Sequence, residues 1–151
     1  MTETKLAPKM PKWMVDHVDR YLSSKGTDGH MLNIPTNPKP VPTLLLTTKG
    51  RKSGEKFLFP LIYGKAGNSY VVIASKGGAP EHPGWYRNLL ADPHVELQVG
   101  PEHLKAVART ATGAERSKLW EQLVGIFAPF ADYQRKATAR EIPVVVLDPV
   151  G

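Results

Sequence analysis

Residues 41–75 read VPTLLLTTKGRKSGEKFLFPLIYGKAGNSYVVIAS, and this stretch decides the fold. It holds three β-prone runs separated by two turns: Thr43–Thr48, Lys56–Tyr63 and Ser69–Ser75. The first turn, Lys49–Glu55, is basic and contains glycine, and turns this short join strands that run antiparallel. Pro60 has no amide hydrogen to donate, so the second strand is expected to lie at an edge or a bulge at that point.

The flanking sequence completes an α+β pattern. Residues 1–9 are expected to form a loose tail and residues 25–42 a proline-rich loop. Three further strands are predicted at Val95–Val99, Leu104–Thr110 and Ile142–Leu147. Helices are predicted over residues 10–24, Gly84–Ala91, residues 112–127 and residues 129–139, the third starting at a capping box from Thr112 to Glu115. Mainly antiparallel strands with flanking helices indicate a small closed or split β-barrel at 41–151, preceded by an N-terminal tail, helix and loop at 1–40.

Composition excludes several classes of protein. The 151 residues are 41% hydrophobic and 23% charged, as in an ordinary globular domain. The absence of cysteine excludes disulfide scaffolds, thiolate zinc sites and iron–sulfur centres, and the five histidines show no metal-ligand spacing, so no metal is expected. No apolar run approaches the roughly 20 residues of a membrane-spanning helix. The N-terminus lacks a signal-peptide pattern, so a cytoplasmic location is expected.

The positive charge is concentrated in the first third. The net charge is +6, and residues 1–56 hold ten Lys and Arg against five Asp and Glu. Such a surface suits nucleic acid, anionic lipid or a phosphorylated cofactor, or it serves only solubility. The helix at 10–24 is amphipathic, with one face formed by Trp13, Met14, Val18, Tyr21 and Leu22. This face either packs on its own domain, covers a site, or touches a partner or membrane.

Two glycine- and cation-rich turns are the candidate chemical sites. They are TTKGRKSGEK at residues 47–56 and ASKGGAPEHPGWYRN at residues 74–88. Glycines let backbone amides face a ligand, and cations neutralise phosphate or carboxylate oxygens. Each turn alone is often a plain solvated turn, but two in one small domain favour a shared anionic ligand. The late aromatic residues Phe127, Phe130 and Tyr133 form either a core face or a pocket lid with one hydroxyl.

The order of these motifs resembles a known family. TTKGRKSGE, FPLIY and VVIASKGGAPEHPGWYRNLLADPHVELQV are similar to the deazaflavin-dependent nitroreductase family, over residues 40–149. These reductases use reduced coenzyme F-420, an 8-hydroxy-5-deazaflavin with a phosphate and an oligoglutamate tail. The resemblance implies a split β-barrel of the FMN-binding-like type. It also implies hydride transfer to electron-poor acceptors such as quinones, activated enones or nitro compounds.

The resemblance also implies the site residues. The phosphate and tail would be held by Arg51, Lys52, Ser53 and Lys56. The deazaflavin ring would lie on Pro60 and Leu61. The ring's polar edge and the phosphate path would be lined by Ser75, Lys76, Gly77, Gly78 and Ala79. The surrounding site would be shaped by Trp85, Tyr86 and Asn88. The substrate pocket would contain Trp13, Phe127, Phe130 and Tyr133, and the catalytic groups would be Tyr133 and Ser75.

Three positions depart from the family pattern. Phe57 stands where relatives commonly place a second arginine, so either Lys56 substitutes for it or the cofactor tail binds more weakly. Phe127 and Phe130 stand where the best-known nitroreductase of the family has tyrosines. A changed substrate range, with poor turnover of nitroimidazoles, is therefore expected. A flavin-mononucleotide enzyme on the same barrel, and a non-enzymatic binder of anionic ligands or membrane, remain alternatives. The expected partners are a small-molecule electron acceptor and, through residues 1–24, weak contact with the inner face of the membrane. No nucleic acid is expected, and the chain would be a monomer or homodimer.

Overall fold

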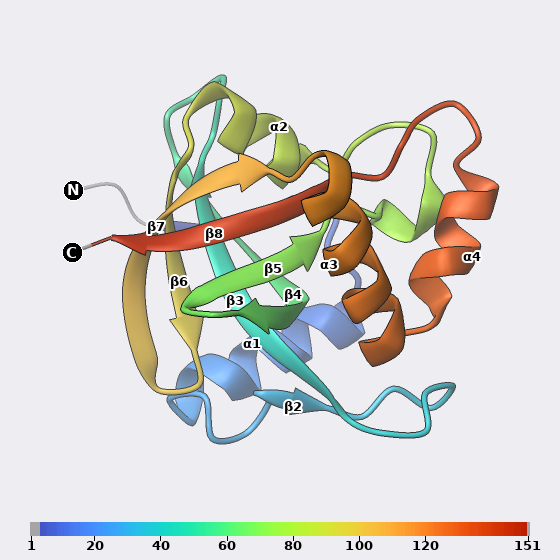
Figure 1. Cartoon of the computed structure of the whole chain (residues 1–151). Helices are drawn as coiled ribbons and strands as arrows, with labels where there is room; N and C mark the ends of the chain where they lie inside the picture. Colours follow the sequence, from blue (N-terminus) through green and yellow to red (C-terminus); the bar gives the residue numbers. More distant parts are fainter. Residues whose placement is uncertain (1–3, 151) are drawn as a thin grey trace.

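A closed barrel of six strands forms the centre of the computed structural model, which describes residues 4–150 (Figure 1). In chain order the strands are β3 (Val41–Lys49), β4 (Lys56–Ala66), β5 (Ser69–Ile73), β6 (His94–Val99), β7 (Glu102–Thr110) and β8 (Val144–Val150). Around the barrel they run β4-β5-β8-β7-β6-β3, and antiparallel pairing of β3 with β4 closes the ring. The predicted α+β class, with a mainly antiparallel barrel and flanking helices, is confirmed.

Two short strands lie at the rims, where the sequence predicted a tail and a loop. β1 (Thr4–Leu6) runs parallel to β4 beside residues 56–58, and β2 (Met31–Leu32) runs antiparallel to β3. The prediction of a loose tail over residues 1–9 is therefore wrong at residues 4–6, because an edge of β4 distant in sequence pairs with them. Residues 1–3 of that tail lie outside the described residues.

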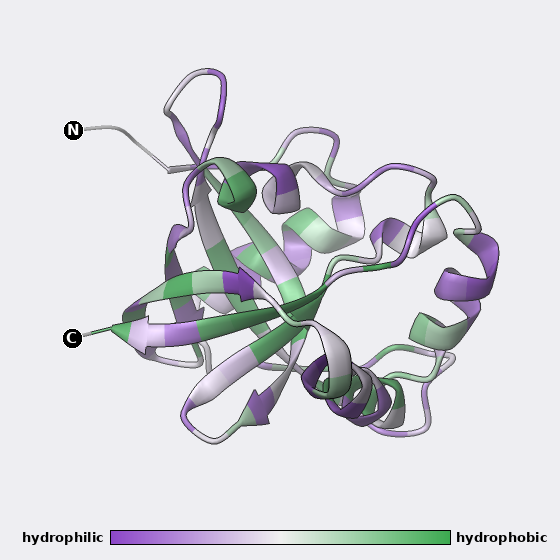
Figure 2. Ribbon diagram, turned by 45° about the horizontal axis from the view of Figure 1, so that its top comes forward, coloured by the Kyte–Doolittle hydropathy of each residue, from purple (hydrophilic) through white to green (hydrophobic). Residues whose placement is uncertain are grey.

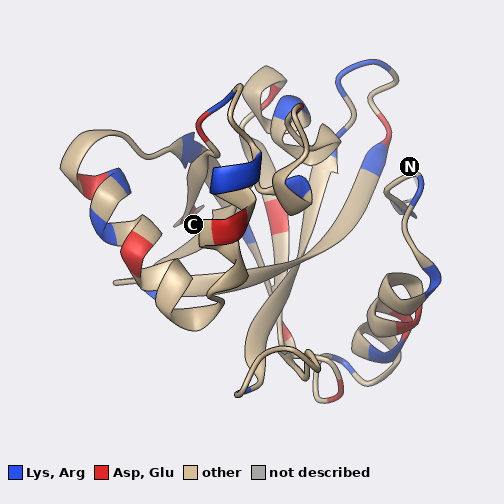
Figure 3. Cartoon of the chain, turned by 90° about the vertical axis from the view of Figure 1, so that its right-hand side faces the viewer, with Lys and Arg blue, Asp and Glu red and all other residues tan. Residues whose placement is uncertain are grey.

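Helices cover the barrel on several sides. They are α1 (Lys12–Ser23), α2 (Gly84–Ala91), α3 (Gly113–Ile126) and α4 (Pro129–Lys136), with a single turn of 3-10 helix, η1 (Lys76–Gly78). α2 lies over one end of the barrel, and α1 and α4 lie on different sides of it (Figures 1 and 3). Thr112 precedes α3, but its side chain makes no capping hydrogen bond, so the predicted capping box is wrong. Glu115 instead pairs with Arg109 of β7 at 2.7 Å.

Alternation along the strands divides the core into an inner and an outer part. Leu44 and Leu46 of β3 belong to the cluster that fills the barrel, whereas Leu45 packs outward against α1. Trp85 and Tyr86 of α2 join the inner cluster from one end. A separate cluster joins β5 and β8 to α3 and α4. Figure 2 shows hydrophobic stretches along the central strands and mixed polarity on the helices.

The buried face of α1 differs from the predicted one. His17, Val18 and Tyr21 are buried, whereas Trp13 is 57% exposed and Leu22 is 46% exposed. Hydrogen bonds fix this rotation of the helix. The Tyr21 hydroxyl donates to the carbonyl of Thr43 at 2.9 Å and accepts from the amide of Gly100 at 2.7 Å. Polar contacts to distant backbone, which hydrophobic periodicity does not report, therefore decide which face is buried.

Candidate functional site

The basic turn between β3 and β4 is fastened to α2 by Asn88. The buried Asn88 side chain accepts from the Arg51 guanidinium at 2.8 Å and from the Arg51 amide at 3.3 Å. Its own amide nitrogen donates to the hydroxyl of Thr48 at 3.1 Å. The Asn88 side chain thus hydrogen-bonds both to the basic turn and to the end of β3. This set of contacts is the junction at Asn88. The two motifs that the sequence singled out separately therefore lie side by side.

The cations of this rim have different surroundings. Arg51 and Lys52 are exposed residues of the turn, and Figure 3 shows the basic residues gathered there. Lys56 pairs with Glu96 of β6 at 2.9 Å, with both side chains about half exposed. Because exposed ion pairs contribute little net free energy, Lys56 can exchange this partner for another anion at small cost.

The glycine loop after β5 has a left-handed backbone. Lys76, Gly77 and Gly78 have φ angles of 46°, 62° and 84°. A Cβ on Gly78 would lie only 2.8 Å from the carbonyl oxygen of Tyr133, so the glycine permits close contact between η1 and α4. The loop and Tyr133, which the sequence predicted for one site, are therefore adjacent. Lys76 also pairs with Glu81 at 2.8 Å, which lowers the pKa of that carboxyl group.

Pro60 and Leu61 lie on a stretch of β4 with one open edge. β3 pairs with this stretch on one side, where Leu45 faces Pro60. On the other edge, β1 pairs with residues 56–58 and β5 with residues 63–66, and no described strand is paired with residues 59–62. Pro60 therefore occupies an edge position as predicted. The Leu61 side chain packs on the cluster inside the barrel.

The aromatic residues of the predicted substrate pocket do not form one group. Phe127 and Phe130 are 7% and 5% exposed and pack edge to face, with ring centroids 5.1 Å apart. They belong to the core beneath α3 and α4, which favours the interpretation as a packed core face. Tyr133 is only partly buried. Trp13 lies on α1, and the views in Figures 1 and 3 separate α1 from α4.

Trp85 and Tyr86 support the site by packing in the core and are not exposed to a ligand. Both are buried at the end of the barrel, and the Tyr86 hydroxyl lies 2.8 Å from the hydroxyl of Thr110. They hold α2 in place and thereby hold Asn88 beneath the basic turn. Their predicted role in shaping the site is compatible with this position.

Sequence reasoning missed Arg140 and His82. Arg140 stands between α4 and β8 and reaches the carbonyls of the glycine loop, at 2.8 Å in the case of Ser75. His82 lies 3.0 Å from the Arg140 guanidinium, and burial together with the charges of Arg140 and Arg87 lowers the pKa of its imidazole. Arg140 belongs to no recognisable motif, so only the tertiary structure reveals the contact.

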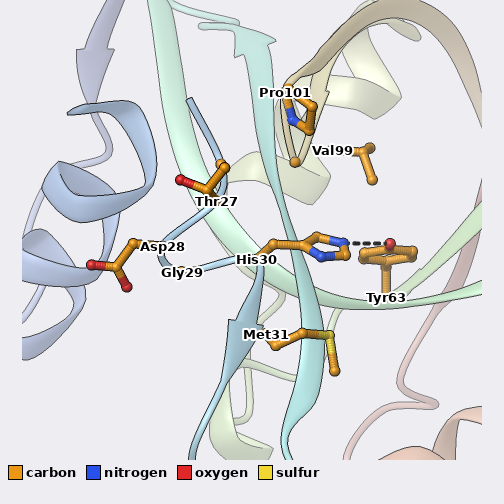
Figure 4. A pocket seen from close by; sticks show the side chains of 10 residues that line it. Thr27, Asp28, Gly29, His30, Met31, Tyr63, Val99 and Pro101 are labelled. Atoms are coloured by element: carbon orange, nitrogen blue, oxygen red, sulfur yellow. Dashed lines mark hydrogen bonds between the residues drawn. The ribbon is translucent and has the colours of Figure 1, made fainter. Parts of the chain in front are cut away.

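A separate open pocket of about 510 Å³ lies toward the opposite end of β4 (Figure 4). His30 and Tyr63 meet across it with a 2.8 Å hydrogen bond, and Gly26 to Met31 and the β6–β7 turn form the rest of its wall. Burial and the neighbouring Tyr70 raise the pKa of Tyr63. None of the predicted site residues lines this pocket.

Two features are absent from the described residues. Within residues 4–150, no group of three or more His, Cys, Asp or Glu side chains is placed to hold a metal ion. Over the same residues, no helix combines the length and apolarity needed to cross a membrane.

A split barrel whose rim gathers cations, glycines and a tyrosine has the architecture of a cofactor-dependent oxidoreductase. Comparison with known proteins makes this specific. The model of the F420H(2)-dependent quinone reductase family matches residues 12–149. The chain therefore belongs to this family, and the resemblance found in its sequence is confirmed.

Individual relatives agree with this assignment. A putative F420H(2)-dependent quinone reductase of Mycobacterium tuberculosis is 43% identical over 111 residues, which is 74% of this chain and 92% of the relative. A solved F420-H2 dependent reductase is 42% identical with a TM-score of 0.66, covering 71% of this chain and 94% of the other. Another solved structure, described as a domain-swapped dimer, is 37% identical with a TM-score of 0.67, covering 90% and 97%.

Proposed function

We propose that this chain is a reductase that transfers a hydride from reduced coenzyme F-420 to an electron-poor organic acceptor, a quinone in the first place. The single observation that carries the proposal is the junction at Asn88. It fastens the cation-rich turn to α2, the helix that follows the glycine loop in the chain, on a barrel whose family uses this cofactor. Activated enones and nitro compounds are further acceptors of the same electronic character.

The residues at the rim fit the chemistry of the cofactor. Its phosphate and oligoglutamate tail are anionic, and Arg51 and Lys52 offer exposed cations beside the hydroxyl of Ser53. The hydroxyl of Ser75 and Lys76, which pairs with Glu81 in this structure, add donors from the glycine loop. The open edge of β4 at residues 59–62 offers backbone groups to the flat ring beside Pro60, which is buried in this structure. Lys56 would join the tail site by exchanging Glu96.

The bound cofactor would supply the hydride, so the protein has to supply orientation and electrostatics. Ser75 and the adjacent backbone donors would stabilise negative charge at the polar edge of the ring. Tyr133, next to Gly78, would hold the acceptor and provide a proton through its hydroxyl. This division of labour requires no metal ligands from the protein, and residues 4–150 contain no group of three or more His, Cys, Asp or Glu side chains placed to hold a metal ion.

A binding titration tests the proposal. Purified protein is titrated with coenzyme F-420 and, separately, with flavin mononucleotide, following ligand and tryptophan fluorescence at low and high salt. We expect salt-sensitive binding of the deazaflavin and much weaker binding of flavin mononucleotide, followed by oxidation of the reduced cofactor on addition of a soluble quinone. Preference for flavin mononucleotide, or binding of neither, would refute the proposal.

Location and membrane contact are part of the same proposal. We place the enzyme in the cytoplasm, with weak docking to anionic lipid through α1 and the segment before it. Exposed Trp13 and its neighbours Lys9 and Lys12 support this contact. Co-sedimentation with anionic vesicles at low and high salt tests it, with Trp13→Ala as the comparison. Absence of pelleting at both salt concentrations would end the idea.

A homodimer is our proposal for the assembly, supported by the solved relative described as a domain-swapped dimer. Light scattering on the purified chain measures the mass directly. A single species at twice the chain mass of 16.6 kDa is expected, and a monomer at all concentrations would contradict the proposal.

A further inference from the structure

Arg140 gathers the backbone of the glycine loop around its guanidinium group. Its Nε donates to the carbonyl of Ala79 at 2.9 Å, and its two terminal nitrogens donate to the carbonyls of Ala74 at 3.1 Å and Ser75 at 2.8 Å. These three acceptors span six residues of one loop, whereas Arg140 lies more than 60 residues further along the chain. The planar guanidinium presents its donors in a fixed geometry, so three bonds define the orientation of the loop.

This orientation has a consequence for the amide hydrogens. In a trans peptide the carbonyl and the following N–H point in opposite directions, and no cis peptide occurs among the described residues. Because the carbonyls of Ala74 and Ser75 point toward Arg140, the N–H groups of Ser75 and Lys76 point away from it. Arg140 therefore sets the direction of two backbone donors that belong to the proposed cofactor loop.

The loop needs such support. Lys76 has a positive φ of 46°, and Gly77 and Gly78 continue the left-handed backbone. A residue with a side chain rarely adopts this conformation, and it persists where the surroundings impose it. The contacts of Arg140 with the residues before and after this segment hold both of its ends.

His82 completes the arrangement. Arginine only donates, so the His82 Nδ1 atom, 3.0 Å from Nη1, has to accept, and the imidazole is neutral with its proton on the other nitrogen. The His82 ring also packs edge to face on Tyr86, with centroids 5.0 Å apart. The guanidinium is thus placed between the glycine loop and α2.

We infer that Arg140 is a positioning residue for the cofactor, fixing the peptide planes of the glycine loop so that the Ser75 and Lys76 amides are directed at the anionic or carbonyl oxygens of the bound deazaflavin. This inference rests on the proposed function for the identity of the ligand. Its structural part, control of the loop by Arg140, can be measured without ligand.

The experiment compares Arg140→Lys with a matched control, Arg116→Lys. Arg116 is partly buried like Arg140 and also donates to a backbone carbonyl, that of Ile142 at 2.8 Å, but among the described residues it makes no hydrogen bond to the glycine loop. Each variant is measured by thermal unfolding, by hydrogen exchange of the peptide covering residues 74–82, and by titration with coenzyme F-420.

For Arg140→Lys we expect exchange in residues 74–82 to rise at least about tenfold. The Kd for coenzyme F-420 should rise by about tenfold or more, the factor that loss of one hydrogen bond to a charged group brings. For Arg116→Lys we expect a comparable fall in melting temperature, with exchange of the loop and the Kd within about twofold of wild type.

Four results separate the possibilities. Unchanged exchange of the loop in Arg140→Lys overturns the inference, and so does an equal loss of affinity in both variants. Faster exchange with an unchanged Kd also overturns it, because the loop would then move without affecting the ligand. If the wild-type chain fails to bind coenzyme F-420, the proposed function fails, and the exchange data still decide whether Arg140 controls the loop.

Discussion

Replacing Gly78 by alanine tests the contact between the glycine loop and α4. Gly78 has a φ of 84°, and an added Cβ would lie 2.8 Å from the Tyr133 carbonyl oxygen and 3.1 Å from the Tyr133 Cα. A left-handed backbone costs an L-residue roughly 1–2 kcal/mol. Overpacking against atoms that cannot swing aside adds about 1–3 kcal/mol. The expected loss of unfolding free energy is therefore about 2–5 kcal/mol.

Gly77→Ala is the matched control. Gly77 has a φ of 62°, but an added Cβ would meet nothing within 4 Å. Only the backbone penalty of roughly 1–2 kcal/mol applies there. Since 1 kcal/mol shifts the melting temperature of a chain this long by about 2–4 °C, thermal and urea unfolding resolve the two variants.

The two variants should also differ in activity. Because the clash is with the backbone of Tyr133, Gly78→Ala should displace the tyrosine from the loop and lower kcat/KM for a quinone more than Gly77→Ala does. Equal destabilisation and equal activity of the two variants would refute the contact. Greater destabilisation by Gly78→Ala than by Gly77→Ala, with equal kcat/KM, would confirm the packing contact but refute its role in the reaction.

Three further changes have expected outcomes. Asn88→Ala removes the hydrogen bonds to Arg51 and Thr48. It should lower the free energy of unfolding in urea by about 1–3 kcal/mol and raise the Kd for coenzyme F-420. An unchanged Kd would contradict the role of the junction. Tyr133→Phe should lower kcat roughly tenfold or more with an unchanged Kd, measured by steady-state turnover and titration, and unaltered kcat would remove Tyr133 from catalysis. The lowered pKa of His82 means that the unfolded chain binds more protons, so the stability from its neutral form is complete above about pH 6.5 and declines as pH falls below that value. His82→Asn should weaken the fall in urea midpoint between pH 7.5 and pH 5, and an identical fall in both proteins would contradict the assignment.

The strands and their turns could be predicted because local sequence determines them. The run around Lys49–Glu55 combines β-prone flanks with a glycine turn, and the structure pairs β3 with β4 across it. Pro60 also lies where it was expected, because a residue without an amide hydrogen suits the open edge of β4. In these cases the residues themselves carry the physical cause.

Elements fixed by distant partners could not be predicted. Thr4–Leu6 forms a strand only because residues 56–58 offer an edge. Glu115 does not form the expected capping box, because Arg109 binds its carboxylate with two hydrogen bonds. The exposure of Trp13 follows from the anchoring of Tyr21 to Thr43 and Gly100. Each of these outcomes depends on a contact that the sequence pattern alone does not contain.

The same distinction explains the form of the site. Its chemical groups lie in recognisable motifs, but three tertiary contacts, which the motifs do not reveal, join the segments that carry them. Asn88 fastens the basic turn to α2, Gly78 admits α4 to the loop, and Arg140 closes the loop from the segment before β8. Because the site is assembled from segments so far apart in the chain, unfolding disperses it. A ligand that contacts all of them therefore binds only the folded chain and stabilises it by RT ln(1 + [L]/Kd), about 2.7 kcal/mol at a hundredfold excess over Kd.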